Sequence, residues 1–205
     1  SEAMEDNGIP GISGVDTREL ARTIRDEGAQ KAIITDADTP LKECLKKMAE
    51  WTFPSDCVKQ VSCKKRWYSR TANPKYNVAV IDCGIKLNII REMNEMGCNL
   101  TILPYDTDAE QIMRLNPDGV FISNGPGDPE NVPEVVETLK QLRGRVPVFG
   151  ICLGHQIMAL AGGAHTYKMK FGHRGGNHPV QNLETGRIEI TSQNHSYAVD
   201  EDSLK

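Results

Sequence analysis

Residues 146–156 read VPVFGICLGHQ, and this stretch decides the fold. Its first part, 146–151, is a short apolar run of the kind that forms a buried parallel strand. It leads directly into a Gly-x-Cys-x-Gly turn around Cys152, and a helix is expected at 155–161. Glycines permit such a tight turn because they have no Cβ. Strand, turn and helix in this order predict the cysteine version of a nucleophile elbow.

The chemistry expected at this elbow centres on Cys152. The turn presents the thiol at the carboxyl edge of the sheet, and the N-terminus of the following helix favours the thiolate through its dipole. The backbone N–H of Leu153 then lies where an oxyanion would form. The alternative interpretation is a buried structural cysteine between two packing glycines. The strand–turn–helix context favours the nucleophile.

The residues before the elbow alternate between strand and helix patterns. This alternation predicts an α/β domain with an open, mostly parallel sheet flanked by helices. Another strand is expected near the C-terminus, at 187–191. The strands expected before the elbow lie at 77–82, 99–103 and 119–123, and the helices at 87–97, 108–115 and 132–142.

A glycine-rich loop, NGPGDP at 124–129, follows the strand at 119–123. Ligands of open α/β sheets bind at the carboxyl ends of the strands, which is where this loop is expected. An ordinary turn rich in Gly, Pro and Asp is the simpler interpretation of the loop alone. Together with the elbow, it predicts an oxyanion hole formed by the backbone N–H groups of Gly125 and Leu153.

Residues 1–70 have a different pattern and are predicted to be part of a smaller α/β domain. A linker is expected at 71–76, and the larger domain at 77–205. The elements expected in the first part are a helix capped by Asp16 or Thr17 and ended by Gly28, a strand at 31–35 and a helix at 40–51.

Composition excludes several classes of protein. The formal net charge is −4 and the pI about 5.8, which argues against a nucleic-acid-binding protein. The basic stretch at 64–66 is short, so it is interpreted as an exposed strand or a partner contact. No apolar run is long enough to cross a membrane. The six cysteines show neither disulfide nor zinc spacing, so reduced thiols and a cytoplasmic location are expected.

NGPGDP followed by PVFGICLGHQ resembles the class I glutamine amidotransferases. Within that family, the chain is similar to the small subunits of carbamoyl-phosphate synthases along essentially its whole length. The stretches that carry this narrower resemblance are GVDTREL with ARTIRDEGA (14–29), VIDCGIKLNIIREM (80–93), YKMKFGHRGGNHPV (167–180) and TSQNHSYAVD (191–200).

The resemblance implies that the chain hydrolyses L-glutamine and that ammonia passes to a large subunit, which makes carbamoyl phosphate for arginine and pyrimidine synthesis. ATP, magnesium and bicarbonate would be used by that partner, and no cofactor is expected in this chain. Cys152 would attack the glutamine amide and form a thioester, with the oxyanion held by Gly125 and Leu153. The residues that match the family's glutamine-binding positions are Gly125, Gly127, Leu153, Gln156, Asn194, Ser196 and Tyr197.

The sequence departs from the family pattern in one respect. The family's base and its orienting carboxylate belong to a His-Pro-Glu motif, which does not occur here; His178-Pro179 is followed by valine. The chain is therefore expected to lack both ends of the small subunit, and to have a nucleophile without its base. His155 is interpreted as structural and His195 as shaping the pocket. His165, His173 and His178, with Arg174, are interpreted as a loop or subunit contact.

Two other functions compete with glutamine hydrolysis. One is a binding and regulatory subunit without hydrolase activity, which describes a chain that has lost its base. The other is a different cysteine hydrolase with the same elbow, such as an enzyme resembling dienelactone hydrolase. The NGPGDP loop and the QNHSYAVD stretch at 193–200 argue against that second alternative.

Overall fold

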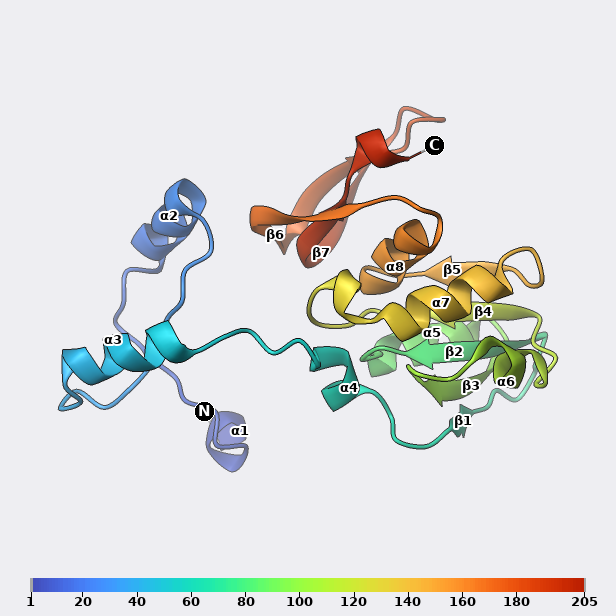
Figure 1. Ribbon diagram of the computed structural model, residues 1–205, viewed down its shortest axis with the longest axis horizontal. Coiled ribbons are helices and arrows are strands. Elements are labelled where there is room, and N and C mark those ends of the chain that lie inside the picture. Colours follow the sequence, from blue (N-terminus) through green and yellow to red (C-terminus); the bar gives the residue numbers. More distant parts are fainter. Residues whose placement is uncertain (1, 205) are drawn as a thin grey trace.

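The computed structural model describes residues 2–204, and its centre is a five-stranded sheet in the order β1-β3-β2-β4-β5 (Figure 1). Strands β2 to β5 run parallel to one another, and β1 pairs antiparallel with β3 at the edge of the sheet. The open, mostly parallel α/β sheet predicted from the sequence is thereby confirmed. The strands are β1 (Trp67–Ser69), β2 (Tyr76–Asp82), β3 (Cys98–Pro104), β4 (Gly119–Ile122) and β5 (Val148–Gly150).

Helices cover both faces of this sheet, because its strands are apolar on both sides. In β2, Ala79 and Ile81 pack towards the face covered by α6, α7 and α8, whereas Val80 packs with Ile90 of α5 on the other. Ile81 and Val80 are both completely buried. The helices are α5 (Leu87–Glu95), α6 (Ala109–Met113), α7 (Pro133–Leu142) and α8 (Leu153–Ala161), close to the predicted ranges.

Residues 57–69, which the sequence pattern placed in the first domain, pack with the sheet. Helix α4 (Cys57–Val61) inserts Val58 into the main core. The hydroxyl of Ser62 accepts a hydrogen bond from the backbone of Tyr105 at 3.0 Å. The strand expected near the basic stretch at 64–66 forms as β1, at the edge of the sheet.

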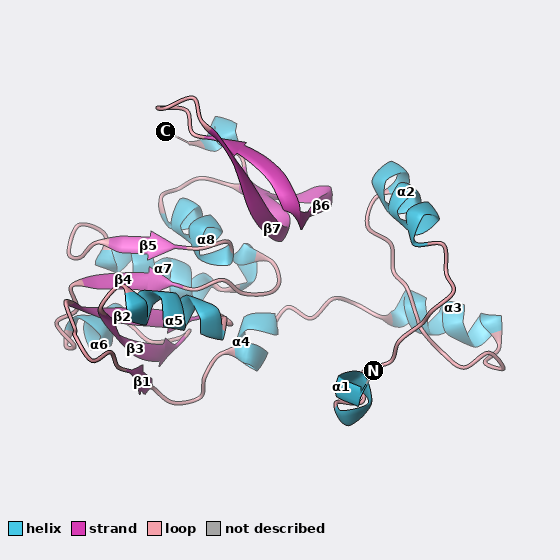
Figure 2. Cartoon of the chain, turned by 180° about the vertical axis from the view of Figure 1, so that it is seen from behind, coloured by secondary structure: helices cyan, strands magenta, loops and turns pink. Residues whose placement is uncertain are grey.

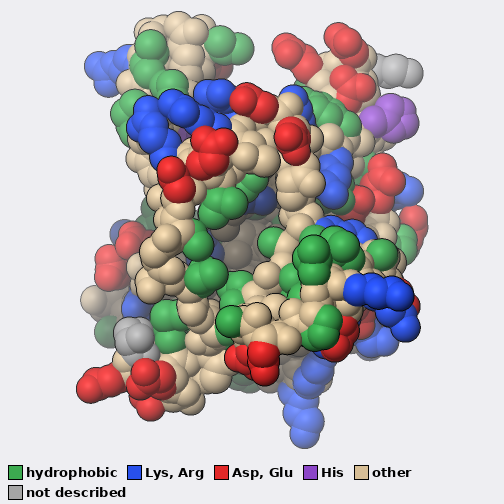
Figure 3. All heavy atoms as spheres, turned by 90° about the vertical axis from the view of Figure 1, so that its left-hand side faces the viewer, with side chains coloured by type: hydrophobic (Ala, Val, Ile, Leu, Met, Phe, Trp, Pro, Cys, Tyr) green, Lys and Arg blue, Asp and Glu red, His purple; other side chains and the backbone are tan. Residues whose placement is uncertain are grey.

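Residues 2–54 contain three helices that stand apart from the sheet (Figures 1 and 2): α1 (Glu2–Asp6), α2 (Thr17–Glu27) and α3 (Leu41–Glu50). Of the two predicted caps, Asp16 is the one that caps α2, accepting from the backbone N–H groups of residues 18 and 19. The predicted strand at 31–35 is wrong, because this stretch is irregular and pairs with no strand in the described chain. Figure 3 views the molecule from the side on which these three helices lie, and it shows hydrophobic side chains around a central hollow.

A long antiparallel hairpin completes the fold, formed by β6 (Thr166–Gln181) and β7 (Ile188–Val199). It lies beside α8, so that the start of the helix and the middle of β7 come together (Figure 1). The predicted strand at 187–191 is the first part of β7. Two short 3-10 turns, η1 (Pro129–Asn131) and η2 (Glu201–Ser203), follow the glycine-rich loop and the hairpin. Among residues 2–204, no helix has the length and apolarity required to cross a membrane.

Candidate functional site

The elbow at Cys152 has the strained backbone that its motif requires. Cys152 has φ 54° and ψ −107° at the N-cap of α8, in a region that residues other than glycine rarely adopt. A Cβ on Gly150 would lie 2.5–2.8 Å from backbone atoms of Gly154 and His155. A Cβ on Gly154 would overlap the carbonyl oxygen of Ile122 in β4. The two glycines thus let strand, turn and helix approach closely enough to hold the cysteine in this geometry.

The glycine-rich loop lies against the elbow, as predicted. A Cβ on Gly125 would overlap the carbonyl oxygen of Cys83 and lie 2.7 Å from Leu153 Cδ2. Gly125 and Leu153, the two residues expected to form the oxyanion hole, are therefore neighbours. Asn124 holds the loop in place, because its amide donates to Gly84 O at 3.0 Å and accepts from Lys86 N at 3.3 Å.

A buried carboxylate supports the loop beneath this site. Asp82, only 5% exposed at the end of β2, accepts backbone hydrogen bonds of 2.9 Å from Cys63, Gly84 and Ile85. Because a buried charge is costly unless it is fully hydrogen-bonded, these three donors fix the turn after β2. That turn is the segment to which Asn124 is bound.

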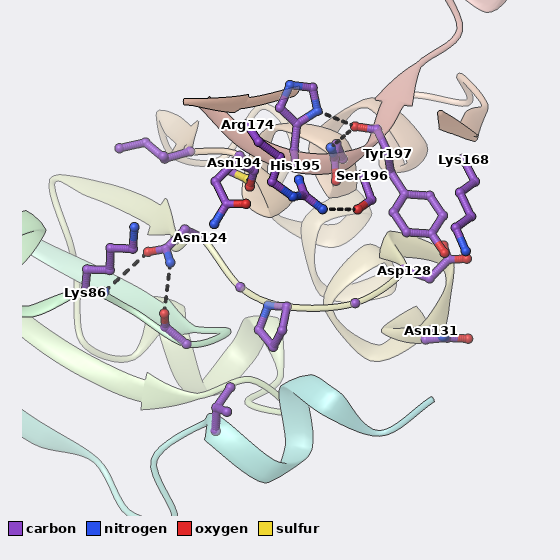
Figure 4. A pocket seen from close by; sticks show the side chains of 18 of the residues that line it. Lys86, Asn124, Asp128, Asn131, Lys168, Arg174, Asn194, His195, Ser196 and Tyr197 are labelled. Carbon is purple, nitrogen blue, oxygen red and sulfur yellow. Dashed lines mark hydrogen bonds between the residues drawn. The ribbon is translucent and has the colours of Figure 1, made fainter. Parts of the chain in front are cut away.

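Strand β7 forms the third wall of the site. The carbonyl oxygen of Asn194 lies 4.0 Å from Cys152 Sγ. The buried side chain of Gln156 donates to Tyr197 O at 2.6 Å, which ties α8 to the strand. Elbow, loop and strand enclose a cavity of about 820 Å³ (Figure 4). The predicted residues that line it are Gly125, Gly127, Cys152, Gln156, Asn194, Ser196 and Tyr197. The side chain of Leu153 is buried in the core instead.

His195 lines the cavity, but its ring is engaged elsewhere than at the thiol. Its Nδ1 lies 2.8 Å from Tyr197 O, and its Nε2 lies 3.1 Å from Gln193 Oε1 and 3.1 Å from His173 Nδ1. These contacts agree with a role in shaping the pocket, as expected from the sequence, and supply no hydrogen bond to Cys152.

The histidine cluster differs from the expected one. His173 lies between His195 and His178, with ring centroids 4.9 and 5.3 Å away, and Nε2 of His178 is buried without a partner. His165 lies apart from them, where its backbone N–H donates to Ser203 at the end of the hairpin. The long-range pairing of β6 with β7 creates this arrangement, which residue spacing could not show. Within residues 2–204, no group of His, Cys, Asp or Glu has the arrangement of a metal site.

Charged residues of the cavity were not predicted as site residues. Lys86, Lys168 and Arg174 contribute three cations and Asp128 a carboxylate. Burial raises the pKa of the Tyr197 phenol, and the neighbouring carboxylate of Asp128 raises it further. Asp128 lies in the NGPGDP loop and Arg174 in the 167–180 stretch, so both were within recognised segments without an assigned role in binding.

The other thiols near the site are suited to packing. Cys83 is completely buried, and burial raises its pKa to about 12. Burial and the nearby Asp82 raise the pKa of Cys63 to about 11. All six cysteines are free. Cys152 alone among them lines the cavity, which supports the choice of this thiol as the reactive one.

Comparison with known protein families gives two matches. A model described as glutamine amidotransferase class-I matches residues 79–205, a range that begins within β2 and includes β3, β4, β5 and the hairpin. A second, described as the CPSase domain of the carbamoyl-phosphate synthase small chain, matches residues 1–34.

Curated relatives match over the whole length of the chain. The chain is 51% identical over 204 residues to the carbamoyl phosphate synthase small chain of Staphylococcus saprophyticus, covering all of this chain and 55% of that protein. It is 48% identical to the small chain of Listeria innocua, covering 100% of this chain and 56% of the relative. The chain therefore spans about half the length of the curated relatives it matches.

A crystal structure of a protein from Thermoplasma acidophilum, assigned as part of a GMP synthase, has a similar fold. Its TM-score is 0.53 at 22% identity, covering 61% of this chain and 67% of the other. At this identity the likeness concerns the fold alone, and it confirms the architecture described above.

Proposed function

The chain belongs to the class I glutamine amidotransferase family, and from this premise we propose that it carries the glutamine-binding and nucleophilic part of a carbamoyl-phosphate synthase small subunit. The observation that carries the proposal is the position of Cys152. It occupies a strained elbow at the N-terminus of α8 and lies in a cavity formed by the residues expected to bind glutamine.

In the proposed reaction, the thiolate of Cys152 attacks the side-chain amide carbon of glutamine. The carbonyl oxygen becomes an oxyanion, which the backbone N–H groups of Gly125 and Leu153 stabilise. The tetrahedral intermediate collapses to a thioester, and the amide nitrogen takes up a proton and leaves as ammonia. Water then attacks the thioester, which releases glutamate and regenerates the thiol. The adjacency of Gly125, Leu153 and Cys152 supports this assignment.

We assign no histidine of this chain as the base. Both ring nitrogens of His195 face other groups, and His155 lies outside the cavity. This observation favours a second candidate for the chain alone, namely glutamine binding with little or no turnover. Stoichiometric reaction of Cys152 together with negligible steady-state glutamate release would support this candidate. Sustained glutamate release that is lost in Cys152→Ala would exclude it.

The proposed partner is the large subunit of carbamoyl-phosphate synthase, as the names of the relatives imply. Ammonia made at Cys152 would be used there, with ATP, magnesium and bicarbonate bound by the partner. Carbamoyl phosphate would then serve arginine and pyrimidine synthesis. A cytoplasmic location is part of the same proposal and is supported by the six free thiols.

Mass spectrometry after treatment with a glutamine-mimicking diazo-ketone tests the proposal. We expect one adduct, located on Cys152, that free L-glutamine suppresses and that Cys152→Ala abolishes. Cys57 is a matched internal control, because it lies beside Gly127 and is partly exposed but does not line the cavity. Equal labelling of both thiols, or none at all, would refute a specific glutamine site. Faster reaction with small esters or lactones would instead support the other class of cysteine hydrolase.

A further inference from the structure

The cavity contains more positive than negative charge, and this excess has no part in the mechanism above. Glutamine carries an α-ammonium and an α-carboxylate at the end opposite to the reacting amide. A binding site for it therefore benefits from a cation facing the carboxylate. Lys86, Lys168 and Arg174 line the cavity, and Asp128 contributes a carboxylate to the same lining.

Among the three cations of the cavity, Arg174 is the one whose charged group is oriented by hydrogen bonds in the described chain. Its guanidinium donates to Ser196 Oγ at 2.7 Å through Nη2 and to the carbonyl oxygen of His173 at 3.3 Å through Nη1 (Figure 4). Because the planar group is already oriented, less conformational freedom is lost on binding a ligand. No carboxylate lies within ion-pair distance of it in residues 2–204. Its remaining N–H donors suit a bidentate contact with a carboxylate.

The register of the hairpin places Arg174 near the reacting atom. Arg174 pairs directly with Asn194 across β6 and β7, and the carbonyl oxygen of Asn194 is 4.0 Å from Cys152 Sγ. Opposed residues of an antiparallel pair have Cα atoms about 5 Å apart. Extended glutamine separates its amide carbon from its carboxylate carbon by four bonds, roughly 5 Å. Cys152 and Arg174 line the same cavity, so we expect the carboxylate of an extended substrate attacked at Cys152 to lie on the Arg174 side of it.

The two lysines are less suited to this role. The close-up shows Lys168 in the same part of the cavity as Asp128 and the phenol of Tyr197 (Figure 4). Lys86 lies on the other side of the cavity, next to Asn124 (Figure 4). Within the described chain, neither ammonium makes a hydrogen bond that would orient it, in contrast to the guanidinium of Arg174.

We propose that Arg174 determines substrate specificity by binding the α-carboxylate of glutamine, and that Ser196 positions its guanidinium. This rests on the proposed function, since it assumes that glutamine is the ligand. The role of Ser196 follows from the hydrogen bond that its hydroxyl accepts from Arg174.

A competition experiment tests the contact without requiring turnover. Iodoacetamide alkylates Cys152, and the rate at this cysteine is measured by peptide mass spectrometry with increasing L-glutamine or L-glutaminamide. The second ligand replaces the α-carboxylate by a neutral amide. We expect glutamine to protect at about tenfold lower concentration, because a hydrogen bond to a charged group is lost in glutaminamide.

Arg174→Gln should then raise the protecting concentration of glutamine about tenfold and leave that of glutaminamide within about twofold. Arg174→Lys should fall between, because it keeps the charge and loses the planar fork. The matched control is Lys168→Gln, which removes a cation from the same strand and cavity. It should shift both ligands equally and by less than about threefold.

The outcomes separate this inference from the proposed function. If glutamine and glutaminamide protect the parent chain equally, or if Lys168→Gln alone removes the preference, the role of Arg174 is refuted and the glutamine site stands. If neither ligand protects Cys152 in the parent chain, both proposals fail. A preference for glutamine that disappears only in the Arg174 variants supports the inference.

Discussion

The close contact between α8 and β4 predicts that the substitution Gly154→Ala destabilises the fold. Gly154 lies in the first turn of α8, and a Cβ there would overlap the carbonyl oxygen of Ile122. The same Cβ would lie 2.9 Å from the carbonyl carbon and 3.0 Å from Cβ of that residue. All three atoms belong to, or are attached directly to, the backbone of a strand paired on both sides. Gly154→Ala therefore forces the helix away from the sheet.

Two effects of opposite sign compete in this variant. Without a clash, replacing glycine by alanine in a helix would stabilise the fold by up to about 1 kcal/mol. Overpacking of a well-packed core costs about 1–3 kcal/mol. We expect the second effect to exceed the first, because the colliding atoms cannot rotate away. For a chain of this size, about 1 kcal/mol shifts the melting temperature by about 2–4 °C. A decrease of several degrees is thus expected.

Thermal and urea unfolding followed by circular dichroism would measure this change. Gly119→Ala is the matched control, because Gly119 begins β4 and a Cβ there would meet only Pro147 O, at an ordinary 3.6 Å. It should change the free energy of unfolding much less. Labelling of Cys152 by the diazo-ketone should also slow in Gly154→Ala, since the elbow moves with the helix. If Gly154→Ala unfolds at the same temperature as Gly119→Ala, or higher, the described elbow packing is wrong.

Three further predictions concern the same region. Cys152→Gly should be more stable than Cys152→Ala by about 1 kcal/mol, because only glycine adopts the observed φ of 54° without strain; equal unfolding midpoints would contradict this geometry. Asp82→Asn should lower the free energy of unfolding by about 1–3 kcal/mol in urea titrations, since its amide nitrogen cannot accept from the backbone donors that the carboxylate now binds. The pKa of Cys83 is raised by burial from 9.0 to about 12, so the folded state binds this proton more tightly. Its contribution to stability is present in full below about pH 9 and is lost as pH rises towards 12. Unfolding measured between about pH 8 and 11 should show this decline, and Cys83→Ala should reduce it.

Much of the sheet domain could be predicted because its strands and helices carry their own signals. The run at 77–82 is apolar on both faces, and the amphipathic stretch after it ends at a glycine, so β2 and α5 were expected near their observed positions. The elbow was predictable for the same reason, since strand, glycines, cysteine and helix are contiguous. Residues 57–69 carry no such pattern, and only their contacts with the sheet show that they belong to it.

The predictions that differed depend on contacts between distant residues. The stretch 31–35 has strand-like composition, but a strand forms only beside a partner, and none lies there in the described chain. The hairpin register brings Arg174 opposite Asn194 and His173 against His195, which sequence spacing alone could not show. Accordingly, the elbow, the glycine-rich loop and the 191–200 stretch predicted part of the cavity lining, whereas the charged residues of the cavity were identified only from the fold.

A crystal structure of the chain after reaction with the diazo-ketone glutamine analogue tests the central claim most directly. The account predicts a covalent bond to Cys152 Sγ, with the ligand's carbonyl oxygen within hydrogen-bond distance of the backbone nitrogens of Gly125 and Leu153. A ligand bound to another cysteine, or one whose carbonyl oxygen points into solvent away from both nitrogens, would contradict it.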